Sequence, residues 1–463
     1  RGGAEVERRP GFGRKRHCLT GRLPDPPAAA SPERPIWCRP IGPRAPEEKV
    51  AVIGSGIAAR WTALRLAEAG LRPLLVGPEP SDGTPPHPPA ALIAPKLVRG
   101  TTAYARLSAL SYLTTVREME RIAGEIPGLW LARGVLEPWG DADGTARRQD
   151  LVRTLDWPAD WLESRAEGLF HPRAGVVDPA PLHSRLAERA VDLGAARDAR
   201  PVAALDRQAD GWRLADADGA TIASVPTVIL AAGPYGTALL PDAEAWAEIR
   251  HSGGRLFRPA PAGDWPDHAL NYGGFVTPAL GPAQDGRALL GASAHAAATP
   301  EAAAAAESGC AAESVADCLA RLARVRPDLA RLLDDAGGSA EPPSWTGVRS
   351  TTPDHLPLAG PVPDPASYRR HFRALAQGAR ATPTPTATVD RPGLFAITAL
   401  GARGYQMAPF LAEAIASQLA GAPLPLAARD LAALHPARTL MRGMAREAPA
   451  GRTASGRNAG TTA

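Results

Sequence analysis

Residues 50–79 read VAVIGSGIAARWTALRLAEAGLRPLLVGPE, and this stretch decides the fold. Its apolar run at 50–53 is short and β-branched, which predicts a strand buried on both faces. The pattern G-x-G-x-x-A follows at 54–59, and a helix is predicted over 60–69. A second apolar run at 73–76 completes a strand–helix–strand unit. The stretch therefore predicts a Rossmann-like α/β unit that binds a dinucleotide.

Each small residue of this pattern has a physical role. Gly54 allows a tight turn, Gly56 lets a pyrophosphate approach the backbone, and Ala59 lets the helix pack on the strand. Ser55 and Ile57 lie in the same turn. The phosphates are expected at the helix N-terminus, where unpaired N–H groups and the helix dipole favour negative charge. In a glycine-rich chain the alternative is a simple packing turn, but strand, turn, helix and second strand arrive in register and favour dinucleotide binding.

The acidic residue that binds the adenosine ribose is displaced in this chain. It is expected at the end of the second strand, about 20 residues after the glycines. That position is occupied by Gly77, and the first carboxylate after it is Glu79. Glu79 is therefore the predicted ribose ligand.

The bulk properties set limits on the class of protein. At 463 residues the chain is long enough for two or three domains with a large core. Its hydrophobic content of 44% and charged content of 22% are ordinary for a soluble globular protein. No run approaches about 18 apolar residues, so no membrane span is predicted. The net charge of +4 permits a nucleic-acid partner but does not argue for one.

The cysteines and the chain ends carry further expectations. The cysteines show no metal-ligand spacing, so we predict no metal site and free thiols in a reducing, cytoplasmic compartment; they are Cys18, Cys38, Cys310 and Cys318. The chain begins with Arg1 rather than Met, which we interpret as a fragment or a displaced start. Residues 25–46 are rich in proline and are predicted to form a linker. The polar tail at 446–463 is predicted to be disordered.

The middle of the chain alternates between helical and strand patterns. Helices are expected over 104–124 and 178–194. A hairpin is expected around Asp218-Gly219, and a buried strand over 228–232 that ends at Gly233.

Two longer segments follow. Alternating patterns over 250–298 predict the antiparallel sheet of a second domain, and 301–333 predicts a helical stretch. Near the C-terminus an apolar strand at 394–400 and a glycine turn at 401–404 precede a helix over 408–420. The N-terminus of this helix is expected to address another part of the same cofactor.

Three sequence motifs resemble one family. Residues 349–360 are similar to its R-x-x-x-x-DHLP-x-x-G signature, and 401–404, 408–409 and 436–438 are similar to its C-terminal motifs. Residues 9–16 resemble the last strands of a methyltransferase domain. The family is the glycine oxidase and D-amino acid oxidase class of FAD-dependent oxidoreductases. More narrowly, the chain resembles the oxidoreductase half of the bifunctional enzymes that build 5-methylaminomethyl-2-thiouridine at the tRNA wobble position.

The resemblance implies a domain organisation. It implies a Rossmann-like FAD-binding domain interleaved with an antiparallel-sheet substrate domain, α/β in class and α+β overall. Residues 1–24 are then the remnant tail of a methyltransferase domain, and 47–445 form the oxidoreductase. The FAD-binding parts are expected at about 47–105, 170–245 and 340–440, and the substrate part at about 106–169 and 246–339.

The resemblance also implies a reaction on a CH–NH group. In this family, FAD accepts a hydride from the carbon next to the amine of 5-carboxymethylaminomethyl-2-thiouridine. Hydrolysis of the imine then gives the 5-aminomethyl nucleoside and glyoxylate. The methyltransferase half is absent from these residues. The implied cofactor is FAD, the implied substrate is tRNA, and a separate methyltransferase chain is a further partner; the oligomeric state is left open.

Arg349 is the predicted anchor for the substrate carboxylate, because a guanidinium binds a carboxylate bidentately. The alternative is a structural ion pair with Asp354, which we place with Arg349 in a Pro- and Gly-rich loop. Tyr272 is a second catalytic candidate, for a hydrogen bond in the pocket, with a core role as its alternative. The predicted cofactor-binding residues are Gly54, Ser55, Gly56, Ile57, Ala59, Glu79, Val202, Gly233, Gly401, Arg403, Gly404, Tyr405 and Gln406.

The chain departs from the family at two places, and two other functions stay open. The family's Ser-Gly-Asn segment is replaced at 81–87, and its R-G-Q segment at 253–256. A small-molecule amine oxidase acting on glycine, sarcosine or a D-amino acid is one alternative. A catalytically decayed relic without flavin is the other.

Overall fold

The computed structural model describes most of the chain. The described residues are 5–10, 17–22, 38, 41–79, 87–98, 100–140, 142–155, 157–240, 246, 248–261, 263–307, 314–335, 342–373 and 389–447. The predictions for 81–86, for most of the proline-rich linker and for the tail after Glu447 lie outside these ranges.

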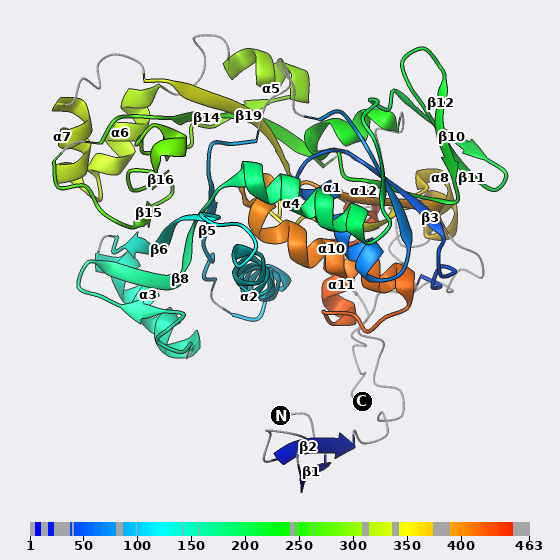
Figure 1. The fold of residues 1–463 in the computed structure, drawn as a ribbon, viewed down its shortest axis with the longest axis horizontal. Helices are drawn as coiled ribbons and strands as arrows, with labels where there is room; N and C mark the ends of the chain where they lie inside the picture. The colour runs from blue at the N-terminus through cyan, green and yellow to red at the C-terminus, as the bar shows by residue number, and fades with distance from the viewer. Residues whose placement is uncertain are drawn as a thin grey trace, which may run out of the picture.

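A six-stranded sheet carries the predicted dinucleotide-binding unit (Figure 1). Its order is β20 (Leu358–Pro363), β21 (Asp390–Thr398), β13 (Thr227–Leu230), β3 (Lys49–Ile53), β4 (Arg72–Val76) and β9 (Ala196–Asp198). The strands from β21 to β9 are parallel, and β20 is antiparallel to β21. The predicted strands at 50–53, 73–76, 228–232 and 394–400 are all confirmed within this sheet, and so is the α/β class.

Both faces of this sheet are covered, as its uninterrupted apolar strands require. On β3, Val50 and Val52 pack into one buried cluster, whereas Ala51 and Ile53 pack into another. The helices α1 (Ile57–Glu68), α4 (Pro179–Asp192) and α10 (Gly404–Ala420) pack together on the first face. The opposite face packs against the small sheet of β10 (Ala204–Gln208), β11 (Gly211–Ala215) and β12 (Thr221–Val225). The predicted hairpin at 218–219 connects β11 and β12 and is confirmed.

The second sheet has ten strands, predominantly antiparallel. Its path is β18 (His295–Ala297), β14 (Arg250–Phe257), β17 (Leu290–Gly291), β16 (Phe275–Val276), β15 (Ala269–Asn271), β6 (Trp130–Pro138), β8 (Gly168–Val177) and β5 (Ala91–Ile93). Two further strands join it, β19 (Ser344–Thr351) on β14 and β7 (Glu163–Ser164) on β8. The antiparallel sheet predicted over 250–298 is confirmed, but the sequence patterns did not reveal β6 and β8. The division of the chain into FAD-binding and substrate segments stays a prediction.

The remaining helices agree with the predicted helical segments and add detail to one of them. The predicted helix at 104–124 is α2 (Ala103–Ala123), and the predicted stretch at 301–333 is three separate helices: α5 (Pro300–Glu307), α6 (Val315–Ala323) and α7 (Pro327–Asp335). The helical character of this stretch is confirmed, and new helices begin within it because Ser314 forms a capping box that starts α6, and Pro327 starts α7. The others are α3 (Ala142–Leu155), α8 (Pro365–His371), α11 (Ala428–Leu434), α12 (Ala437–Glu447) and the 3₁₀ turns η1 (Gly233–Leu239), η3 (Pro282–Gln284) and η4 (Gly401–Arg403).

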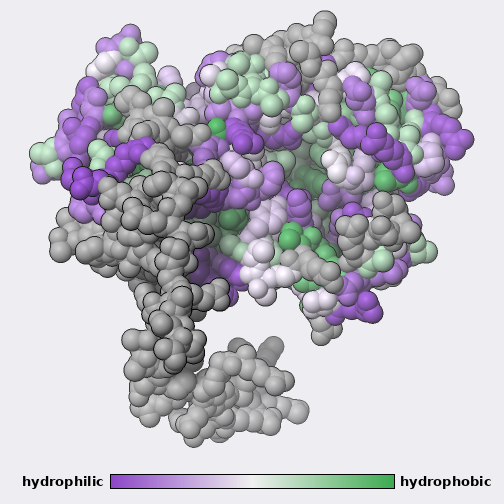
Figure 2. All heavy atoms as spheres, turned by 180° about the vertical axis from the view of Figure 1, so that it is seen from behind, coloured by the Kyte–Doolittle hydropathy of each residue, from purple (hydrophilic) through white to green (hydrophobic). Residues whose placement is uncertain are grey.

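The N-terminal segment and the surface complete the description. β1 (Glu5–Pro10) and β2 (His17–Arg22) form a separate antiparallel pair, and their origin in a methyltransferase domain stays a prediction. Figure 2 shows hydrophilic and hydrophobic side chains interspersed over the face opposite to that of Figure 1. None of the helices in the described ranges combines the length and apolar character needed to cross a membrane. Cys38 and Cys318 are buried and form no disulfide within the described ranges.

Candidate active site

The candidate site lies where three parallel strands of the six-stranded sheet end. β21, β13 and β3 are neighbours, and residues that follow their carboxyl ends line a cavity of about 570 Å³. β19 of the ten-stranded sheet lines the same cavity. Open α/β sheets bind their ligands at this edge. The cavity therefore connects the predicted cofactor turn with the second sheet.

The turn after β3 depends on glycine. Gly54 has a φ of +131°, and a Cβ at this position would lie 2.5 Å from the carbonyl oxygen of Ala231. Gly56 precedes α1 and makes no side-chain cap bond, and no atom lies within 4 Å of the position that its Cβ would take. The helix thus begins with uncapped N–H groups beside open space, which is an arrangement suited to an anion.

A second helix begins at the same cavity. Arg403 is the N-cap residue of α10 and makes no side-chain cap bond to the helix. Gly401 has a φ of +59°, which explains why the turn between β21 and α10 requires glycine. Gly404 and Tyr405, in the first turn of α10, line the cavity. The predicted strand–turn–helix at 394–420 is confirmed, although the helix begins at Gly404 rather than at 408.

Arg349 lies on a strand, and its prediction as a loop residue was wrong. β19 pairs with β14 as far as Thr351, so the Pro- and Gly-rich loop starts only after that residue. The Nε of Arg349 donates to the Oγ of Ser252 at 3.0 Å, and its Nη2 donates to the carbonyl oxygen of Ser293 at 3.0 Å. These two bonds hold the guanidinium plane at the cavity wall. Among the described residues, no Asp or Glu lines the cavity.

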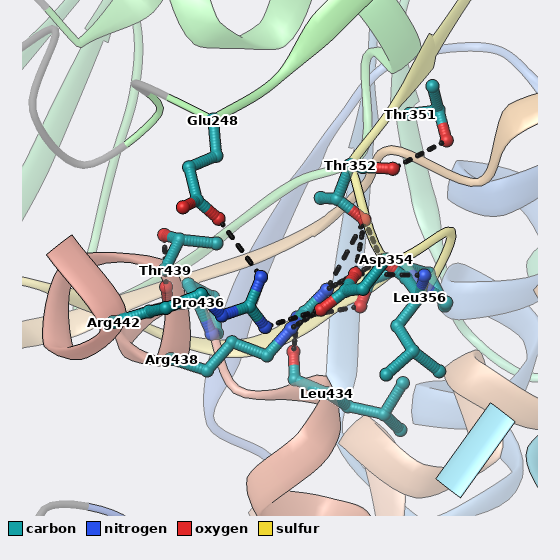
Figure 3. Close-up of polar contacts among 11 residues, drawn as sticks. Glu248, Thr351, Thr352, Asp354, Leu356, Leu434, Pro436, Arg438, Thr439 and Arg442 are labelled. Atoms are coloured by element: carbon teal, nitrogen blue, oxygen red, sulfur yellow. Dashed lines mark hydrogen bonds and ion pairs between the residues drawn. The ribbon is translucent and has the colours of Figure 1, made fainter. Parts of the chain in front are cut away.

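Asp354 has partners other than the predicted Arg349 (Figure 3). One carboxylate oxygen accepts from Thr352 Oγ1 at 2.7 Å and from Arg438 Nη2 at 3.2 Å. The other accepts from Arg442 Nη2 at 2.6 Å, and Arg442 also pairs with Glu248 at 3.3 Å. Although burial opposes ionisation, the bonds to Arg438 and Arg442 hold the pKa of Asp354 well below its usual value. Asp354 thus fastens α12 to the loop after β19.

Nine of the predicted site residues line the cavity together. They are Gly54, Ser55, Gly56, Ile57, Gly233, Arg349, Gly401, Gly404 and Tyr405. Six others do not: Ala59, Glu79, Val202, Arg403, Gln406 and Tyr272. Ala59 is fully buried, in agreement with the packing role predicted for it. Val202 is half-buried and packs against the cluster between the six-stranded and the small sheet.

Glu79 lies beyond the end of β4 and is held by arginines. Its carboxylate accepts from Arg60 Nη2 at 2.8 Å and forms an ion pair with Arg197. The usual position of the ribose acid is Gly77, whose Cβ would lie 3.1 Å from the carbonyl carbon of Gly54. A side chain at that position is therefore disfavoured, because the contact is tight and the φ of +156° is one that residues with a Cβ rarely adopt. The role of Glu79 as ribose ligand stays a prediction.

Arg403 and Gln406 point away from the cavity. Arg403 Nη1 donates to the carbonyl oxygen of Ala94 at 2.9 Å, and Gln406 is buried with its Nε2 3.4 Å from the carbonyl oxygen of Ser108. Successive helical side chains point about 100° apart, so one turn cannot direct four consecutive side chains into one cavity. Only the backbone of this turn and Tyr405 remain as candidates for contact.

Tyr272 occupies the core position that was the alternative to its predicted role. Its ring packs against the cluster under α6 and α7, near Cys318 and Leu322. Burial raises the pKa of its hydroxyl. It lies in this cluster because the chain reverses at Gly273, with a φ of +96°, directly after β15.

Sequence reasoning missed several lining residues. Trp345 on β19 and Tyr235 on η1 line the cavity, as do His87 and His183. The spacing Trp345-x-Gly347-x-Arg349 would have placed Trp345 on the same face as the anchor if the segment had been identified as a strand. No sequence signal pointed to the two serines that bind Arg349.

The histidines keep one wall of the cavity neutral. His183 Nε2 lies 3.0 Å from the Tyr405 hydroxyl, and its ring meets that of His87 edge-on at 4.3 Å. Burial, together with His87 and Arg60, holds the pKa of His183 well below its usual value. Burial also raises the pKa of Tyr405. At neutral pH we therefore expect a neutral His183 and a protonated Tyr405.

The described residues fit a flavin dinucleotide. Space is open at Gly56 and Gly233, where no atom lies within 4 Å of a Cβ position. Two helix N-termini without side-chain caps meet the cavity, and an anionic diphosphate satisfies such N–H groups. Apolar side chains such as Ile57 and Leu400 supply surface for a ring system. Across the described ranges, no group of three or more His, Cys, Asp or Glu side chains could hold a metal ion.

Substitutions of Gly54 and Gly56 by alanine are expected to affect different properties, stability in one case and flavin binding in the other. Gly54→Ala is expected to lower the thermal unfolding midpoint, because positive φ costs about 1–3 kcal/mol and the methyl group meets Ala231 at 2.5 Å. Gly56→Ala is expected to leave that midpoint unchanged but to reduce the flavin-to-protein absorbance ratio, because its methyl group enters the open space. Thermal unfolding of apoprotein and absorbance of purified protein measure the two effects. Equal behaviour of both variants would contradict this assignment.

Comparison with known proteins agrees with this geometry. The family model described as FAD dependent oxidoreductase matches residues 49–418. A Magnetococcus marinus protein named tRNA 5-methylaminomethyl-2-thiouridine biosynthesis bifunctional protein MnmC is 30% identical over 96% of this chain and 67% of its own length. The protein of the same name from Chromohalobacter salexigens is 32% identical over 93% of this chain and 62% of its own length. The chain thus spans about two thirds of the length of these relatives.

Solved structures show the same fold. Glycine oxidase from Geobacillus kaustophilus aligns with a TM-score of 0.59 and 17% identity, over 84% of this chain and 98% of that one. Iminodiacetate oxidase from Chelativorans sp. BNC1 aligns with a TM-score of 0.59 and 16% identity, over 82% of this chain and 97% of that one.

Proposed function

The chain belongs to the family of FAD-dependent oxidoreductases, and from this premise we propose that it acts on tRNA. The proposed reaction removes the carboxymethyl group of 5-carboxymethylaminomethyl-2-thiouridine and leaves 5-aminomethyl-2-thiouridine. Support comes from the named relatives, which align over nearly the whole of this chain. Methylation of the product belongs to a separate chain or to a segment outside this sequence. We place the reaction in the cytoplasm, where tRNA is modified.

The residues proposed to hold FAD come from both helix N-termini. The turn from Gly54 to Ile57 receives the diphosphate, because α1 begins there without a side-chain cap. The turn from Gly401 to Tyr405, of which Gly401, Gly404 and Tyr405 line the cavity, would contact the ring system. When bound, FAD would supply the acceptor for the hydride that leaves the substrate C–H bond, while the N–H proton is released to solvent.

The residues of the chain itself bind and orient the substrate. Arg349 holds the carboxylate, and its bonds to Ser252 and Ser293 set the direction from which the carboxylate approaches. Oxidation converts the C–N single bond next to the carboxylate into an imine. Water then adds to the imine carbon, the C–N bond breaks, and the products are glyoxylate and the primary amine. Positioning of this kind accounts for several kcal/mol of barrier lowering in enzymes.

The observation that carries the proposal is that the glycine turn and Arg349 share one cavity. The glycine turn and Arg349 line the same space, so a cofactor and a carboxylate-bearing amine can meet there. A small-molecule amine oxidase is the second candidate, favoured by the fold of glycine oxidase and by an anchor that requires only a carboxylate.

Product analysis tests the proposal. Holoenzyme is incubated with tRNA that carries 5-carboxymethylaminomethyl-2-thiouridine, and the digested nucleosides are separated. We expect the 5-aminomethyl nucleoside and an equal amount of glyoxylate, with no methylated product. Unchanged tRNA together with oxidation of glycine or sarcosine would favour the second candidate, and a protein that retains no flavin would exclude both.

A further inference from the structure

β19 lines the cavity, and β14 is its antiparallel neighbour. The antiparallel register pairs Ser252 with Arg349, Gly254 with Gly347, and Leu256 with Trp345. Residues opposite one another in antiparallel strands point to the same face. Trp345, Gly347 and Arg349 alternate along β19, and all three line the cavity. An aromatic ring and a guanidinium therefore lie on one face of one strand.

Two glycines make room for these large side chains. A Cβ on Gly347 would lie 2.1 Å from Cη2 of Trp345, so the indole ring lies over this glycine. A Cβ on Gly254 would lie 3.5 Å from Cζ of Arg349, so the guanidinium lies close to that glycine. The ring is thus folded along β19 toward Arg349. The Cα atoms of Trp345 and Arg349 are about 13 Å apart, at about 3.3 Å per strand residue.

A second aromatic ring lines the same cavity. Tyr235 on η1 is 41% exposed, and η1 contacts β19. Within the described ranges four large hydrophobic side chains are exposed, and Tyr235 is the aromatic one among them. The other three are Leu113, Val191 and Leu193. Exposed aromatic rings beside a polar anchor are typical of ligand surfaces.

We propose that Trp345 and Tyr235 form an aromatic platform on which the pyrimidine ring of the substrate stacks. The carboxymethylamino arm of that pyrimidine then extends to Arg349. This inference rests on the proposed function and makes it more specific, since it assigns the residues that distinguish a base-linked glycine from a free one. Aromatic side chains bind unstacked bases in this way in proteins that recognise single-stranded RNA.

The chemistry of the cavity favours this substrate over a free amino acid. Glycine or sarcosine would satisfy Arg349 but has no ring that could stack on Trp345. A base connected to the glycine unit by a short chain of single bonds covers both groups at once. Binding energy from the base is then available to orient the reacting carbon.

The test compares two ligands in binding and in reduction of the holoenzyme. One is the nucleoside 5-carboxymethylaminomethyl-2-thiouridine, and the other is sarcosine, which lacks the base. Affinity is measured from the perturbation of the flavin spectrum or the quenching of tryptophan fluorescence, and reduction from anaerobic bleaching. Variants are Trp345→Ala, Trp345→Phe and Gly347→Ala, whose methyl group would displace the indole ring. Trp161→Ala, outside this cavity, is the control.

Trp345→Ala is expected to weaken nucleoside binding about 10- to 100-fold, the range for loss of one base–aromatic stack. Trp345→Phe retains most of the affinity, Gly347→Ala resembles Trp345→Ala, and sarcosine binding changes little in any variant. If the nucleoside binds independently of Trp345, or does not bind, the platform is overturned. If it binds in a Trp345-dependent manner but does not reduce the flavin, the platform stands and the proposed reaction fails.

Discussion

Replacement of Arg349 by alanine is expected to lower kcat/KM for the carboxylate-bearing amine by roughly 10³-fold. Loss of one partner of a buried, hydrogen-bonded charge pair costs about 2–5 kcal/mol, and 4 kcal/mol is about a thousandfold. Arg349→Lys keeps the charge but loses the planar fork, so an intermediate loss of about 10- to 100-fold is expected. Steady-state kinetics of the flavin-loaded variants measure both effects.

The control for this prediction lies on the paired strand. Arg250, an exposed residue of β14 opposite Thr351, is not part of the cavity lining, and Arg250→Ala is expected to change kcat/KM less than about twofold. A substrate analogue without the carboxylate provides the second control. Wild-type enzyme should discriminate strongly against it, whereas Arg349→Ala should treat the two compounds almost alike. Retained discrimination in Arg349→Ala would refute the role of Arg349 as anchor.

Replacement of Asp354 by alanine is expected to lower the free energy of unfolding by about 3–5 kcal/mol, the typical cost of removing one partner of a buried ion pair. Arg438 is 6% exposed and would remain buried without its carboxylate partner. Arg442 and Thr352 would each lose a bond as well. Chemical denaturation of the purified variant measures the change. Asp267→Ala is the matched control, because Asp267 is 99% exposed and its loss should have almost no effect.

The same carboxylate predicts a dependence of stability on pH. The native pKa of Asp354 lies below the ordinary value of 3.8, so its contribution is fully present above about that pH. The contribution is lost as the pH falls from there toward the depressed native pKa. Wild-type protein should therefore lose stability in acid more steeply than Asp354→Asn. Parallel acid unfolding curves for the two proteins would contradict the ion-pair account of Asp354.

Local patterns were sufficient for most of the dinucleotide-binding sheet. The turn at 54–59 could be predicted because its glycines serve the backbone itself, through a positive φ at Gly54 and open space at Gly56. The turn at 401–404 was predictable for the same reason. A glycine that is needed for the backbone conformation can be recognised from the local sequence alone. Nine of the predicted positions line one cavity.

The rest of the site depends on pairing between distant segments. Arg349 was assigned to a loop because Pro and Gly follow it, whereas its strand is defined by hydrogen bonds to β14, about a hundred residues earlier in the chain. The same pairing brings Ser252 to Arg349, and no local pattern reports it. Tyr272 lies outside the cavity lining and packs against the cluster under α6 and α7, a tertiary contact that no local pattern reports.

The stability and substrate predictions concern adjacent parts of one structure. Thr352, which is fully buried, follows β19 directly and bonds to Asp354. Arg349 and Trp345 lie on the same strand, upstream of this attachment. The ion pairs of Asp354 therefore fasten the end of the strand that carries both the anchor and the platform.

Anaerobic mixing of the flavin-loaded protein with substrate tests the central claim most directly. The protein is mixed with tRNA that carries 5-carboxymethylaminomethyl-2-thiouridine and, separately, with glycine or sarcosine, and the flavin absorbance is followed. The proposed function predicts rapid bleaching with the modified tRNA and little or none with the free amines. Bleaching by glycine or sarcosine, without bleaching by the tRNA, would contradict it.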